Sequence, residues 1–266
     1  MAVNKDMGDF SLLSLVPTVL RARGFRLYTR SGQRLVDLWQ NGGAAVLGHN
    51  PPGLLRELKN TASRGLYAPF PHFLEARFIK ALSVLFPNRD FLLYSSAPAL
   101  LEPLLASGTA ALWRPFLDPK SPFAVLENSI LIPVLPGIQG WRNDLPQGLC
   151  VLAYSSVPDT VKLPVGDILP PVLLAAAARG ICDIIAAPER AKFHFPRIAK
   201  ILPKSPWQRR GIYLSLRDPG IETWDALFRR FLKAGFLIPP IPSQPLILPG
   251  ILSPGEEAKL AETLAS

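Results

Sequence analysis

Few side chains in this 266-residue chain are of the kinds that bind metals or attack substrates. The histidines are His49, His72 and His194, and the two cysteines, Cys150 and Cys182, lie inside separate apolar runs. No Cys-x-x-Cys pair occurs, nor any of the common phosphate-loop, dinucleotide, serine-hydrolase or zinc-protease motifs. We therefore expect no metal site, and we expect two buried thiols in a reducing compartment.

The densest positive charge lies between residues 189 and 217. This stretch holds eight Lys or Arg residues against Glu189 alone, in a chain of net charge +9. Positive charge favours phosphate-bearing partners, and Phe193, Phe195 and Trp207 could stack on bases. Because no known nucleic-acid-binding signature accompanies them, a solvated basic face is the favoured interpretation, with phosphate or nucleic-acid binding as the alternative.

Prolines, 29 in all, divide the chain into short elements and are crowded into its middle. Hydrophobic periodicity predicts helices at residues 54–62, 73–86, 100–113, 172–185, 222–233 and from 254 onward. It predicts strands at residues 24–29, 33–39, 91–94, 123–126, 130–135, 149–154, 210–216 and from 236 onward. Mixed helices and strands of this kind predict an α/β fold. The apolar tracts are too short to span a membrane and no signal peptide is evident, so we expect a cytoplasmic protein.

Three local signals predict how elements begin and end. The pair Ser31-Gly32 is suited to a tight turn between two strands. Gly235 is suited to end the preceding amphipathic helix. Ser253, with Glu256 three residues later, predicts a capping box at the start of the last helix.

The segment GFRLYTRSGQRLVDLWQNGGAAVLGHNPP, which carries Asp37, Gly48, His49 and Pro52, resembles the opening of class III pyridoxal phosphate (PLP)-dependent aminotransferases. Those four residues take the places of that family's opening strands and Gly-His loop. The segment GLYAPFPHFLEARFIKALSVLFPNRDFLLYSS resembles the glutamate-1-semialdehyde aminomutase branch, and residues 211–264 resemble the family's small domain.

The resemblance implies a PLP-dependent transferase-like fold whose large-domain sheet is reduced and whose α/β small domain is formed by both chain ends. Residues 1–63 would be the N-terminal part of the small domain, 64–187 the reduced large domain and 188–266 the rest of the small domain. Only residues 97–171 are available for the middle of the large domain, which leaves room for two or three βα units. The family also implies a homodimer.

The residues that the family needs for its chemistry are incomplete. The family holds the PLP phosphate directly after a strand, where this chain has Ser95, Ser96 and Ala97, followed by Pro98 in place of a glutamate. Lys162 is the one candidate for the Schiff-base lysine. No Asp-Glu pair supplies the acid for the pyridinium nitrogen, and Asp159 is the nearest carboxylate. We expect His49 to be a packing residue of the loop.

Three hypotheses follow. The favoured one is a degenerate aminotransferase-like protein, with PLP retained or lost, that acts by binding or as a dimer partner. The first alternative is an active PLP enzyme with a rearranged site that uses Lys162 on a small amino or keto acid. The second alternative is a phosphate or nucleic-acid binder that uses residues 189–217.

Overall fold

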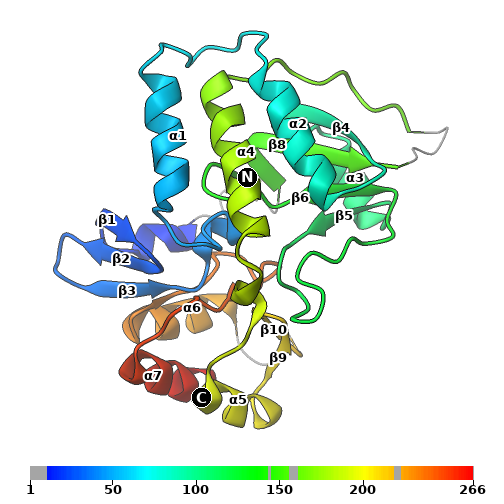
Figure 1. Ribbon diagram of the computed structural model, residues 1–266. Coiled ribbons are helices and arrows are strands. Elements are labelled where there is room, and N and C mark those ends of the chain that lie inside the picture. Colours follow the sequence, from blue (N-terminus) through cyan, green and yellow to red (C-terminus); the bar gives the residue numbers. More distant parts are fainter. Residues whose placement is uncertain (1–10, 143–144, 156–160, 219–222, 266) are drawn as a thin grey trace, which may run out of the picture. The chain divides into compact units, whose positions relative to one another are not determined.

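The computed structural model describes residues 11–142, 145–155, 161–218 and 223–265 (Figure 1). The chain divides into two compact units, one made of Met1–His49 with Lys192–Ser266 and the other of Asn50–Ala191. The two chain ends therefore share one unit, as expected. The N-terminal part of the first unit ends at His49, and in the second unit the helix of residues 52–62 packs on the helix of residues 171–185.

The unit formed by the chain ends contains two small sheets. The first has the order β1-β2-β3-β11 and consists of β1 (Val19–Arg23), β2 (Arg26–Thr29), β3 (Arg34–Asp37) and β11 (Phe236–Leu237). Strand β11 runs parallel to β3, and the other pairs are antiparallel. The second sheet has the order β12-β10-β9 and consists of β9 (Trp207–Arg210), β10 (Tyr213–Leu216) and β12 (Leu246–Ile247).

Three α-helices accompany these sheets in the described part of the unit. They are α5 (Pro196–Ile201), α6 (Trp224–Lys233) and α7 (Pro254–Ala265), and 3-10 turns occur at Ser11–Leu15, Gln40–Gly43 and Leu202–Lys204, the last called η5. Their apolar faces enclose one core, in which Trp207, Phe231 and Phe236 pack edge to face. The predicted helix end is confirmed, because Gly235 follows α6 with a φ of +86°.

The second unit is built on a five-stranded sheet. Its order is β4-β8-β6-β5 with β7 beside β8, and its strands are β4 (Asp90–Ser96), β5 (Ala110–Trp113), β6 (Ile130–Pro133), β7 (Gly140–Arg142) and β8 (Leu145–Tyr154). Helices α1 (Pro52–Ala62) and α2 (Leu74–Leu85) both pack against α4 (Pro171–Ile185) (Figure 1). Helix α3 (Leu101–Ala106) precedes β5, and a 3-10 turn at Pro188–Ala191 ends the unit.

The burial of strand β8 explains why the strands of this sheet are continuous apolar runs in the sequence. Val151 and Ala153 pack with α2 and α4 on one side of the strand, whereas Cys150 and Leu152 pack with α3 on the other. Since successive side chains of a strand point to opposite faces, both faces of β8 are buried. The mixed α/β fold predicted from the sequence is therefore confirmed.

Several sequence-based boundaries were wrong. The helix expected at residues 100–113 ends at Ala106, because Gly108 takes a φ of +75°, and Ala110–Trp113 then pairs with β6. Residues 123–126 form no strand. The strand expected at 210–216 is the hairpin β9–β10, which turns at Gly211 with a φ of +60°. Cys150 is buried as expected, whereas Cys182 is exposed.

Candidate functional site

The end of strand β4 carries Ser95 and Ser96, which with Ala97 are the residues predicted to form the phosphate cup. There the backbone N–H and the hydroxyl of Ser95 both donate to Oδ2 of Asp167, at 2.8 and 2.7 Å. These bonds, the backbone one foremost, lower the pKa of Asp167 from its ordinary value. A carboxylate of the chain itself therefore takes both donors that Ser95 offers to an anion.

The other predicted cup residues, Ser96 and Ala97, lie against strand β8. The N–H of Ala97 donates to the carbonyl of Pro146 at 3.1 Å, and Ser96 lies opposite Gln147 in the β4–β8 ladder. Pro98 has no N–H. The helix that follows, α3, has only six residues, and no side chain caps its start. At this strand end the donors of Ser95 and the N–H of Ala97 are therefore already bonded within the chain.

Asp167 belongs to the segment of residues 161–169, which runs along the outer edge of β4. Hydrogen bonds to β4 hold this segment in place. The N–H of Asp167 donates to the carbonyl of Leu93 at 2.8 Å, and the hydroxyl of Tyr94 donates to the carbonyl of Pro164 at 2.7 Å. Burial raises the pKa of Tyr94 to about 12. The segment occupies the free edge of β4, where an unpaired strand would invite association with another chain.

Lys162 lies in this same segment. Its neighbours Val161 and Leu163 pack against the core cluster around Tyr94, and Lys162 between them is exposed. The alternation of an extended chain turns its side chain away from that core. Asp159, the carboxylate nearest in sequence, lies outside the described residues. Among the residues that are described, no group of three metal-binding side chains comes together.

The Gly-His loop is organised around a buried carboxylate. Asp37 is 1% exposed, and its Oδ1 accepts the N–H groups of Trp39 and Gln40, both at 2.8 Å. Its Oδ2 lies 2.7 Å from Nε2 of His49, and the N–H of His49 donates to the carbonyl of Gly24 at 2.8 Å. His49 is therefore a packing residue of the loop, as expected.

The same loop is tied to the C-terminal part of the chain. Nε2 of Gln40 donates to the carbonyl of Ile247 at 2.9 Å, and the indole of Trp39 donates to Oε1 of Gln244 at 2.8 Å. Since these partners lie more than 200 positions apart in sequence, the network holds the two ends of the chain in one unit.

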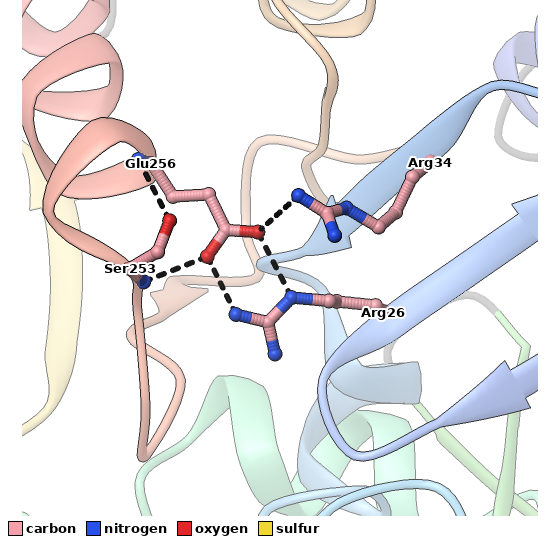
Figure 2. A network of polar contacts seen from close by, with 4 residues as sticks. All are labelled: Arg26, Arg34, Ser253 and Glu256. Atoms are coloured by element: carbon pink, nitrogen blue, oxygen red, sulfur yellow. Dashed lines mark hydrogen bonds and ion pairs between the residues drawn. The ribbon is translucent and has the colours of Figure 1, made fainter.

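The start of α7 carries the predicted capping box, which is confirmed. Glu256 accepts the N–H of Ser253 at 2.8 Å, and the hydroxyl of Ser253 accepts the N–H of Glu256 at 3.3 Å. Figure 2 shows a second role that the sequence did not reveal: Arg26 binds both carboxylate oxygens of Glu256, and Arg34 lies 3.4 Å from Oε1. The bonds from Arg26, and after them those from Ser253, lower the pKa of Glu256 to about 2.

The basic stretch of residues 189–217 divides into groups with different surroundings. Arg209 lies 4.2 Å over the ring of Phe193. Arg217 donates to the carbonyls of Trp207 and Leu202, so both arginines stabilise the fold locally. Arg197, Lys200 and Lys204, by contrast, line a groove beside α7. The expected solvated face is therefore only part of what this stretch does.

Two of the relatives that sequence comparison finds match over most of the chain. An uncharacterized protein of Treponema pallidum is 27% identical over 282 residues, covering 87% of this chain and 88% of the relative. An uncharacterized protein of Borreliella burgdorferi is 28% identical over 256 residues, covering 94% and 91%. Glutamate-1-semialdehyde 2,1-aminomutase of Sorangium cellulosum is 34% identical over 74 residues, which are 28% of this chain and 17% of that enzyme. No protein-family model matches the sequence.

Solved structures of class III aminotransferases share the fold. Ornithine δ-aminotransferase of Plasmodium falciparum matches with a TM-score of 0.65 at 10% identity, over 94% of this chain and 92% of that one. Ornithine aminotransferase of Plasmodium yoelii matches with 0.66 at 9% identity, over 99% and 94%. Acetylornithine aminotransferase of Elizabethkingia anophelis matches with 0.63 at 12% identity, over 94% and 93%. At these identities the similarity shows the fold alone.

None of the described helices has, by itself, the length and hydropathy that a membrane span requires. Pro171–Ile185 and Pro188–Lys204 reach it only when taken together, across a bend of 70°.

Proposed function

Because the chain has the fold of PLP-dependent aminotransferases, we propose that it is a catalytically degenerate relative of those enzymes that acts by binding, as a partner in a homodimer. The observation that carries this proposal is the pairing of Asp167 with both donors of Ser95. In a phosphate cup those donors face an anion of the cofactor, whereas here they face an anion of the protein.

The residues at the end of β4 do not fit PLP. A phosphate would compete with the Asp167 carboxylate for the same two hydrogen bonds, and the two negative charges would repel each other. Pro98 removes one further backbone donor. Exposed Lys162 is separated from the core by its packed neighbours, which does not favour a buried Schiff base.

An exposed aromatic segment between α1 and α2 supports the partner role. The exposed fractions of Tyr67, Phe70 and Phe73 are 64%, 49% and 68%. Aromatic side chains are enriched at protein interfaces, and leaving three of them in water is unfavourable. The proposal places the protein in the cytoplasm, since Cys150 and Cys182 are both free thiols.

Adding PLP to the purified protein is expected to give no near-visible aldimine absorbance. Borohydride treatment is expected to leave the mass of the peptide containing Lys162 unchanged, because no cup holds the phosphate beside that amine. An active aminotransferase of the same fold, treated in parallel, is the positive control. Absorbance together with a reduced adduct on Lys162 would instead establish the enzyme alternative.

Light scattering after size exclusion tests the partner role separately. The wild type is expected to elute as a dimer, and the variant Tyr67→Ser/Phe73→Ser as a monomer, because both replaced rings are exposed and their loss removes interface area without opening the core. The matched control, Val84→Ser, removes an apolar side chain on α2 that is 65% exposed and is expected to remain dimeric. A wild type that is monomeric at micromolar concentration would contradict the dimer-partner role.

A further inference from the structure

A groove lies between α5 with the following turn η5 on one side and α7 on the other, and Figure 1 shows these helices side by side. Its volume is about 780 Å³, and all the residues that line it belong to the unit formed by the chain ends. The groove is therefore independent of the strand end where the PLP site was expected. Its basic side chains, Arg197, Lys200 and Lys204, come from the basic stretch of residues 189–217.

The spacing of residues explains why the groove forms. On α5 and η5 the lining positions 197, 200, 201 and 204 recur at the interval of one helix face, while Ile198 and Leu202 on the opposite face are buried in the core. On α7 the lining positions 258, 261, 262 and 265 recur in the same way, and three of them are alanines. Because alanine has only a methyl group, the two helices leave a hollow between them.

The charges at the groove are unequal. Arg197, Lys200 and Lys204 stand on its rim and are exposed, and Glu262 is the one acidic residue among the lining residues. Within the described residues, the side chains of these three cations have no hydrogen-bond or ion-pair partner. Their charge is thus available to a ligand.

We propose that this groove binds an acidic, amphipathic helical segment of a protein partner. The floor is aliphatic, formed by Ile201, Ala258 and Ala261, and it suits leucine-like side chains that recur along one helix face. The rim suits carboxylates on either side of that face. A nucleic acid fits less well, because no aromatic side chain lines the groove to stack on a base.

The test uses the full chain and a fluorescein-labelled synthetic helix of leucines at helical spacing flanked by glutamates. Fluorescence anisotropy is expected to show saturable binding. Lys200→Glu/Lys204→Glu is expected to weaken it at least about tenfold, because two rim attractions become repulsions. Lys59→Glu/Lys80→Glu makes the same change of net charge in the other unit, and it is expected to alter the affinity less than about twofold.

A second variant tests the apolar floor. Ala258→Trp fills the groove from a half-exposed position on α7 and is expected to weaken the peptide as strongly as the charge reversal. Circular dichroism confirms that each variant is folded. A scrambled peptide of the same composition, which presents no apolar face, is expected to bind at least about tenfold more weakly than the amphipathic one.

Five results would overturn the proposal. The first three are the absence of saturable binding to the wild type, equal weakening by both charge reversals, and equal binding of the scrambled peptide. The fourth is a conversion from dimer to monomer by Lys200→Glu/Lys204→Glu, which would assign the groove to a second copy of this chain. Tighter binding of a labelled oligothymidine that the same variant abolishes would assign it to nucleic acid instead. None of these results bears on PLP, so they are distinguishable from failure of the proposed function.

Discussion

Replacing Asp37 with alanine is expected to lower the free energy of unfolding by about 3–5 kcal/mol. The Asp37 carboxylate is 1% exposed. It accepts hydrogen bonds from the N–H groups of Trp39 and Gln40, and it lies 2.7 Å from Nε2 of His49. Its removal leaves these donors, among them the buried N–H of Gln40, without their acceptor. Urea unfolding followed by circular dichroism measures the loss.

Asp118→Ala is the matched control for this prediction. Asp118 also accepts a backbone N–H, that of Lys120 at 2.8 Å, but it is exposed, so water replaces the lost bond. The control is expected to cost less than about 1 kcal/mol. If the two variants unfolded at the same urea concentration, the Asp37 network would not be what holds the Gly-His loop to the C-terminal segment.

The second large effect is a dependence of stability on pH that originates at Glu256. Its pKa falls from 4.5 to about 2 on folding, and its side chain is only 12% exposed. A carboxyl group with a lowered pKa stabilises the folded state above its unfolded pKa and loses that contribution as the pH falls toward the folded value. The lowering corresponds to at most about 3 kcal/mol at neutral pH.

Comparing the wild type with Glu256→Gln across pH measures this contribution. At neutral pH the variant is expected to be less stable, because the neutral amide binds Arg26 more weakly than the carboxylate does. The difference is expected to shrink between about pH 4.5 and pH 2 as Glu256 takes up a proton. Asp225→Asn, which disrupts the exposed pair with Arg229, is the control and is expected to show a much smaller dependence. A difference that stays constant with pH would contradict the role of the Glu256 charge.

Local signals in the sequence predicted much of the fold. The stripe of Leu74, Phe78, Leu82 and Leu85 is buried on α2, and the alanine-rich run after Pro171 is helix α4. Periodicity within one element identifies these helices, since the residues that share a buried face are neighbours in the chain.

The errors occurred where pairing between strands, rather than a pattern within one segment, determined the outcome. Val19–Arg23 is mostly exposed and has no apolar alternation, yet it forms a strand because β2 lies beside it. Ala110–Trp113 is apolar enough for a helix, but after the turn at Gly108 it pairs with β6. In both segments the partner strand, rather than the residues' own preferences, decides the structure.

The sequence by itself determined the α/β class, the union of the two chain ends in one unit, and the capping box at Ser253. From the sequence we also predicted that the groups needed for PLP chemistry are incomplete. Only the tertiary structure revealed that Asp167 meets Ser95 across 72 positions and that Arg26 meets Glu256 across 230. Helix caps and faces follow from residues a few positions apart, whereas these contacts depend on how separate elements pack, and no local pattern records that.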